Sequence, residues 1–111
     1  MQFKAPKNNE RYQWTGHALG KMRYYGLTAP RILRVINSPA RIEEGVAENT
    51  SAAMQPASVN RQTGKWRAEI WVMYQLKDSR YKIISAWRYP GVSPKRNAVP
   101  EEIMEEIKNL L

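Results

Sequence analysis

Residues 66–89 of this chain read WRAEIWVMYQLKDSRYKIISAWRY and contain its clearest strand signals. Two runs dense in aromatic and β-branched residues, 66–75 and 80–89, flank the turn residues Lys77, Asp78 and Ser79, which predicts a β-hairpin. We expect one face of this hairpin to join the core and the other to carry basic side chains. A period of two groups these residues of the second strand on one face: Arg80, Lys82, Ile84, Ala86 and Arg88.

Weaker strand signals precede the hairpin at 41–47 and 54–60. The small and polar residues between them, 48–53, are typical of a turn, and 61–65 are typical of a hairpin loop. Pro56 indicates that the strand over 54–60 lies at a sheet edge, because proline cannot donate a ladder hydrogen bond. The four strands then form an antiparallel meander.

Helix signals lie on both sides of this strand region. Thr15 suits the N-cap of a helix over 16–25, and Gly26 suits its C-terminal stop. Thr28 caps a second helix that has Pro30 in its first turn. The three residues that end this second helix are Asn37, Ser38 and Pro39.

We therefore expect an α+β fold in which two N-terminal helices pack on a four-stranded antiparallel meander, followed by a C-terminal amphipathic helix. A length of 111 residues predicts a single domain, 1–111. Residues 1–13 form a flexible or edge lead-in, and residues 98–111 hold the last helix.

Composition excludes several classes of protein. The chain has no cysteine, so disulfides and thiolate metal sites are excluded, and its single histidine argues against a zinc site. No apolar run approaches the roughly 18 residues of a membrane span, and residues 1–11 lack the apolar core of a signal peptide. We expect a cytoplasmic protein with no metal, no cofactor and no membrane association.

Charge points to a polyanionic partner. Eighteen Lys and Arg stand against ten Asp and Glu, a formal net charge of +8, and four of the acids lie in the last helix. The rest of the domain is therefore more basic still, and such a field captures polyanions. RNA is the partner that we expect. An acidic protein is the alternative, and one surface can serve both.

The only histidine, His17, lies on one helical face with Lys21 and Tyr24. A neighbouring cation lowers the pKa of a histidine, which favours a neutral imidazole that can accept a proton. Cleavage of RNA without metal needs proton transfer at the 2′ and 5′ oxygens and stabilisation of the phosphorane. The candidate catalytic residues are His17, Lys21, Arg88 and Tyr89. The alternative is that His17 is an ordinary helix-surface or satisfied buried residue.

Cations elsewhere are candidates for phosphate contacts, because arginines beside aromatics on a sheet face can clamp phosphates and stack bases. The alternative is a solvated sheet face on which Glu69 pairs with an arginine across the strands. The candidate nucleic-acid-binding residues are Arg23, Arg31, Arg34, Arg61, Lys65, Arg80 and Lys82.

Three short motifs resemble a bacterial domain family of unknown function, number 4258, which is distantly similar to the RelE and BrnT type of toxin ribonucleases. That family opens on Ser-x-His-Ala-x-x-Arg, a spacer, Arg-Gly-Ile/Leu and Ser/Thr. Residues 35–39 are similar to its helix end, and 83–87 to its last strand. Lys21 and Tyr25 stand where the family has arginines. The residues that match the opening pattern are Thr15, His17, Ala18, Gly26, Leu27 and Thr28.

The resemblance implies a compact α+β fold, a toxin role and an antitoxin as partner. Our leading hypothesis is a toxin-like RNA-binding protein, a metal-independent endoribonuclease of a toxin–antitoxin type. The alternatives are a non-catalytic nucleic-acid-binding module and an interaction domain for an acidic protein. The nuclease hypothesis requires that His17 and Arg88 converge on one positively charged cleft, because catalytic groups must reach one scissile group.

Overall fold

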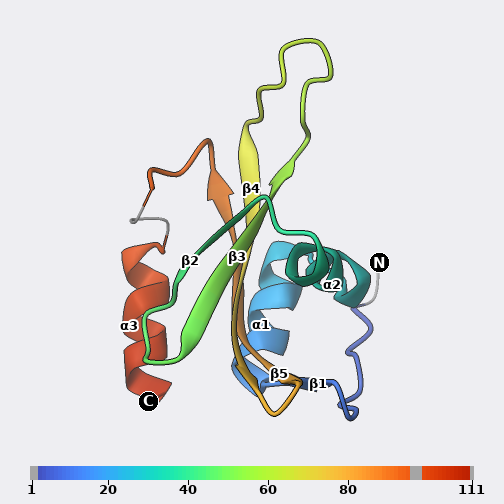
Figure 1. Cartoon of the computed structure of the whole chain (residues 1–111), viewed down its shortest axis with the longest axis vertical. Coiled ribbons are helices and arrows are strands. Elements are labelled where there is room, and N and C mark those ends of the chain that lie inside the picture. Colours follow the sequence, from blue (N-terminus) through green and yellow to red (C-terminus); the bar gives the residue numbers. More distant parts are fainter. Residues whose placement is uncertain (1–2, 96–98, 111) are drawn as a thin grey trace.

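The structure, a computed structural model, describes residues 3–95 and 99–110. The extreme residues of the predicted lead-in and last helix (1, 2, 98 and 111) lie outside this part of the chain. The described strands form one sheet of order β1-β5-β4-β3-β2 (Figure 1). The elements in chain order are β1 (Tyr12–Trp14), α1 (Gly16–Tyr25), α2 (Ala29–Asn37), β2 (Arg41–Glu44), β3 (Thr50–Ala57), β4 (Ala68–Lys77), β5 (Arg80–Pro90) and α3 (Glu101–Leu110).

The two N-terminal helices are confirmed with their caps. The Thr15 hydroxyl accepts a hydrogen bond from the Ala18 amide, and the Thr28 hydroxyl accepts one from the Arg31 amide. Gly26 ends α1 in the left-handed region, with φ 67°, where glycine avoids the steric penalty of a side chain. Each helix turns a short apolar stripe toward the sheet, which both of them cover on one face (Figure 1).

The antiparallel meander is confirmed for β2–β5, but the sheet is wider than predicted. Residues Asp78 and Ser79 both have positive φ and close the β4–β5 hairpin as a type I′ turn. The predicted lead-in, 1–13, ends inside β1, which pairs in parallel with Tyr81–Ile83 of β5. The sheet is therefore five-stranded and mixed. A strand of three residues is too short to show a period, and the Asn8 and Asn9 side chains hold it through hydrogen bonds to its backbone.

The predicted turn at 48–53 is wrong in its last four residues, because β3 begins at Thr50. Ala52 and Ala53 are fully buried, the first on the α3 face of the sheet and the second on the α2 face. Alanine has a low strand propensity, but a small side chain fits where helices cover both faces. The strand with Pro56, β3, lies between β4 and β2, so the prediction of an edge strand is wrong for the strand as a whole. Pro56 itself lies beyond Met54, the last residue that pairs with β2, where no neighbour on that side needs its missing amide hydrogen.

Both faces of the sheet are covered, so the predicted division of the hairpin into a core face and a basic face is wrong. Helices α1 and α2 cover one face and α3 covers the other (Figure 1). A bulge between Met73 and Tyr74 also shifts the alternation along β5. The residues of β4 and β5 that join the apolar core on the α1–α2 face are Ile70, Val72, Tyr74, Ile83 and Ala86, and those that join it on the α3 face are Trp71, Met73 and Trp87.

A buried carboxylate holds the loop after β5 against the sheet. Glu69 is fully buried and accepts hydrogen bonds from Trp66 Nε1 (2.9 Å), Trp71 Nε1 (3.0 Å) and the amide and hydroxyl of Ser93. Arg41 of β2 donates to the Ser93 carbonyl oxygen at 3.0 Å. Burial by itself raises the pKa of Glu69, but the hydrogen bonds outweigh burial and leave this pKa below its ordinary value. The cross-strand pair predicted for Glu69 is thus replaced by a buried polar network.

We predict that Glu69→Gln lowers the free energy of unfolding by about 2–4 kcal/mol, because the two indole donors lose a charged acceptor. The pKa of Glu69 is lowered in the folded state, so its ionised carboxylate adds to the free energy of unfolding. This contribution is fully present above the ordinary pKa of 4.5 and is lost as pH falls through the folded value. Urea unfolding between pH 3 and 7 measures both effects. Glu48→Gln, at an exposed position, is the control, and equal losses for the two variants would contradict the network.

Candidate functional site

The histidine site lies where α1 crosses the edge of β5. His17 Nε2 is 3.2 Å from the Ser85 hydroxyl oxygen and 3.5 Å from Glu106 Oε2. Lys21, one turn further along α1, places its Nζ 2.7 Å from Glu106 Oε1. Ser85 faces α3, since it is paired with Met73 of the α3 face. Residues of α1, β5 and α3 therefore meet around one imidazole.

Burial, more than charge, sets the protonation of this imidazole. The His17 side chain is 17% exposed. Burial lowers its pKa, Glu106 raises it, and Lys21 lowers it, with a net decrease below 6.5. The predicted direction is thus confirmed, but Lys21 is the smallest of the three causes. Glu106 Oε2 is buried, and no hydrogen bond reaches it from the described residues. The Glu106 carboxylate therefore contacts the His17 imidazole and the Lys21 ammonium group, which are the two groups that would contact a phosphate.

The structure does not bring Arg88 to His17. Arg88 Nε donates to the Tyr25 carbonyl oxygen at 2.9 Å, at the C-terminal end of α1, whereas His17 lies in its first turn. Eight residues of helix separate these positions by about 12 Å. A single cleft shared by the imidazole and this guanidinium is therefore not formed.

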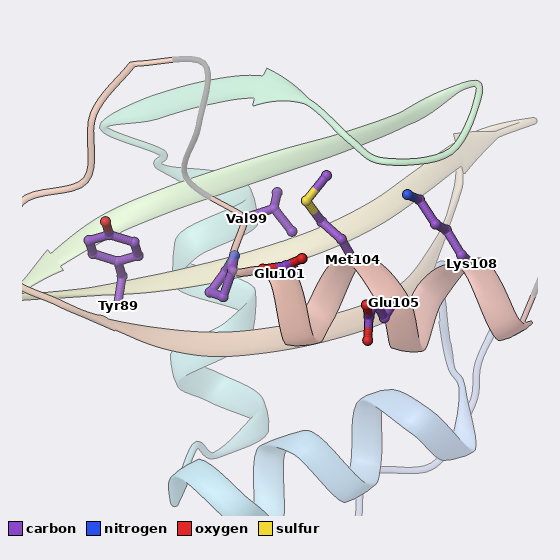
Figure 2. A pocket seen from close by; sticks show the side chains of 7 residues that line it. Tyr89, Val99, Glu101, Met104, Glu105 and Lys108 are labelled. Carbon is purple, nitrogen blue, oxygen red and sulfur yellow. The ribbon is translucent and has the colours of Figure 1, made fainter.

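Tyr89 is also remote from the histidine site. It follows Ser85 by four residues on β5, about 13 Å along the strand. It lines a groove of about 490 Å³ between β5 and α3, shown in Figure 2, together with Glu101, Glu105 and Lys108. The carboxylates of Glu101 and Glu105 outnumber the single ammonium group of Lys108, so this groove does not favour phosphate binding.

A second candidate site lies at the end of the sheet from which the β3–β4 loop, residues 58–67, extends (Figure 1). Ala57, Ala68 and Pro90 are paired across β3, β4 and β5 at this end. The start of α2 reaches the same end, since Arg31 donates to the Pro56 carbonyl oxygen. We call this surface the basic end and define it by Arg31, Arg34, Arg61, Lys65, Arg67 and Arg88.

The charges of Arg34 and Arg88 lie close enough to Arg31 to act on its guanidinium group. Burial lowers the pKa of Arg31, and the charges of Arg34 and Arg88 lower it further. Arg31 also donates to Gln55 Oε1, and the Gln55 amide donates to the Arg34 carbonyl oxygen at 3.0 Å. The guanidinium groups of Arg31 and Arg88 thus donate to neutral acceptors, which are the Gln55 amide and the carbonyl oxygens of Pro56 and Tyr25. These partners leave the positive charge uncompensated, and an anion would stabilise it.

The β3–β4 loop presents its cations from an ordered backbone. Asn60 Oδ1 accepts hydrogen bonds from the amides of Gln62 and Thr63, and the Asn60 amide donates to the Lys65 carbonyl oxygen at 2.8 Å. Arg61 and Lys65 are exposed on this loop. No Asp or Glu occurs at 11–41 or 49–68, which include α1, α2, β3 and this loop. The electrostatic field of these segments is therefore positive throughout.

The other predicted nucleic-acid-binding residues lie elsewhere. Arg80 and Lys82 lie at the far end of the sheet, beside the β4–β5 turn. Arg23 is exposed in the last turn of α1, and its Cζ lies 5.3 Å from the centre of the Phe3 ring. The predicted basic surface is thus divided among the basic end, the N-terminal side of the molecule and the opposite end of the sheet.

Sequence reasoning assigned no binding role to three residues that this geometry makes relevant. Arg67 belongs to the acid-free stretch at 49–68, and that stretch is the signal that could have identified it. Gln55 positions Arg31 only through tertiary contact. Tyr24 is 78% exposed, and Lys21 Nζ lies 5.7 Å from its ring centre. An exposed aromatic ring offers a surface on which bases can stack.

Comparison with family models, curated proteins and solved structures finds no match to this chain. The resemblance to family 4258 and to toxin ribonucleases thus stays a prediction. In the described residues, no helix is long and apolar enough to cross a membrane, and no three His, Asp or Glu side chains cluster as a metal site would require.

We predict that NMR titration gives His17 a pKa below 6.5, and that Glu106→Gln lowers this pKa further, because the carboxylate favours the imidazolium. Since the unfolded imidazole binds protons more readily, the free energy of unfolding falls as pH drops from about 7.5 through 6.5 toward the folded pKa. His17→Gln should remove this part of the pH dependence. A His17 pKa above 6.5 would contradict the burial found for the ring.

Proposed function

We propose that this protein binds RNA through the basic end, as the nucleic-acid-binding part of a toxin-like activity. The observation that carries the proposal is the grouping of Arg31, Arg34 and Arg88 beside the cationic β3–β4 loop, within segments that contain no acid. Phosphates of a polynucleotide relieve such repulsion and release counterions on binding.

Single-stranded RNA suits this surface better than a duplex. The described cations of the basic end come from one helix, one strand and one loop, and the exposed ring of Tyr24 lies on the adjoining helix α1. Single strands are bound by cationic surfaces that follow the backbone and by aromatic rings that stack on bases. An acidic protein can occupy the same surface, but it offers no bases to Tyr24.

We predict that the double variant Arg34→Gln/Arg61→Gln binds a 12-nucleotide single-stranded RNA at least about tenfold more weakly. The dependence of log K on log salt should become shallower by about 1.4 when two phosphate contacts are lost. Fluorescence anisotropy of labelled RNA between 50 and 200 mM salt measures both quantities.

The matched control is Arg80→Gln/Lys82→Gln, which removes the same charge from the opposite end of the sheet. We expect it to change affinity by less than about twofold, because exposed charges farther apart than a Debye length are screened. Equal losses for both double variants would show that only net charge matters. An absence of RNA binding at 50 mM salt would overturn the function.

Endoribonuclease chemistry at the histidine site is a second candidate function, favoured by the contact of one carboxylate with both His17 and Lys21. A phosphate in place of that carboxylate would meet the same two groups. The 2′-hydroxyl would give its proton to His17 Nε2 while its oxygen attacks phosphorus. The 5′-oxygen would leave with a proton from Lys21 Nζ, which yields a 2′,3′-cyclic phosphate and a 5′-hydroxyl end.

This second candidate predicts cleavage of RNA in the presence of EDTA, with a loss of at least about 100-fold in His17→Gln. Glu106→Gln should accelerate cleavage, because the carboxylate repels the phosphate that must replace it. Gel analysis of labelled RNA and growth after expression are the measurements. Cleavage that is unchanged in His17→Gln, or slower in a folded Glu106→Gln, would overturn the mechanism and leave RNA binding as the function.

A further inference from the structure

A groove lies between the N-terminal segment and the junction of α1 with α2. It has a volume of about 1240 Å³, ample for a nucleotide. Its apolar wall includes Phe3, Pro6 and Leu27. We call it the N-terminal groove and define it by Phe3, Lys4, Pro6, Lys7, Arg23 and Leu27.

Every charged side chain that lines the N-terminal groove is a cation. These are Lys4, Lys7 and Arg23, and all three are exposed. None of them is within ion-pair distance of an acid in the described part of the chain, where the ion pairs involve Glu43 and Glu106. The groove therefore offers three uncompensated positive charges around an apolar wall, which favours a ligand with both an anionic and a planar apolar part.

The aromatic contact in the groove fits a nucleobase. The guanidinium of Arg23 lies 5.3 Å from the centre of the Phe3 ring, in a cation–π contact. Bases stack on both guanidinium planes and aromatic rings, so this pair provides a stacking surface beside the two lysines.

The groove also continues from the basic end. Arg88 binds the Tyr25 carbonyl oxygen, and Gly26, the next residue, lines the groove. Along α2, Pro30 lines the groove and Arg31 belongs to the basic end. The groove and the basic end therefore adjoin at the α1–α2 junction, so one bound strand can contact both.

We propose that the N-terminal groove binds one nucleotide unit of single-stranded RNA, with its phosphate held by Lys4 and Lys7 and its base against Phe3 and Arg23. This inference rests on the proposed RNA-binding function and adds a defined nucleotide subsite to it. An uncharged nucleoside lacks the group that the lysines hold, so uridine binds more weakly than uridine 5′-monophosphate.

NMR titration of the full chain with uridine 5′-monophosphate tests the subsite. We expect backbone amide shifts at residues 4, 5, 7 and 26–29, and smaller shifts with uridine. Lys4→Gln/Lys7→Gln should weaken nucleotide binding by at least about tenfold. The matched control, Lys77→Gln/Lys108→Gln, removes two exposed lysines, one beside the β4–β5 turn and one on α3, and should leave binding unchanged.

The outcomes separate the groove from the proposed function. If the 12-nucleotide RNA binds with the predicted salt dependence but the nucleotide shifts only residues of the basic end, the groove proposal is overturned and the function stands. Equal binding of the nucleotide by both lysine double variants would likewise overturn the groove proposal alone. If neither RNA nor the nucleotide binds at 50 mM salt, both proposals are overturned.

Discussion

The hydroxyl of Thr15 joins the start of α1 to β5 at the point where β1 ends, and the histidine site depends on this junction. It accepts from the Ala18 amide at the start of α1, and it lies 2.9 Å from the carbonyl oxygen of Ile83 and 3.2 Å from that of Ile84. Two successive strand carbonyls can face one hydroxyl because β5 bulges here. The contact ends β1, begins α1 and directs the helix along β5, so that His17 reaches Ser85 across the strand edge.

The covering of both sheet faces follows from the composition of β4. Its residues alternate between two apolar sets, one beneath α1 and α2 and one beneath α3, where Trp71 and Trp87 stack with ring centres 5.9 Å apart. Ile103 and Ile107 of α3 are buried against this second set. Packing α3 there brings Glu106 to Lys21 and His17. The packing of α3 on this face thus places a carboxylate at the histidine site, whereas, among the described residues, it places none in an ion pair at the basic end.

The local signals of the sequence were reliable where one residue type has a specific backbone role. Caps at Thr15 and Thr28, the stop at Gly26 and the turn after Lys77 all depend on neighbours within four residues, and the structure has each of them. The signals failed at β1 and at Ala52 and Ala53. At these positions the strand forms because another strand, far away in the sequence, supplies its hydrogen-bond partners. The strand propensity of the residues themselves does not reveal such pairing.

The candidate residues divide in the same way. His17, Lys21 and their shared helix face were evident from spacing, and the cations of 31, 34, 61 and 65 were evident from charge. Their partners were not, because Ser85 and Glu106 lie 68 and 85 residues away from the residues that they contact. The predicted meeting of His17 with Arg88 failed because a bulge and a ten-residue helix set their separation.

The sequence alone thus determined the helices, the meander, the strong positive charge and the chemical types available, since these follow from local backbone preference and from counting. Tertiary structure alone decided which cations lie together, which one is neutralised by α3 and where a groove is left open. Those outcomes depend on the register and crossing of elements far apart in the chain, and Coulomb interactions act through the distances that result.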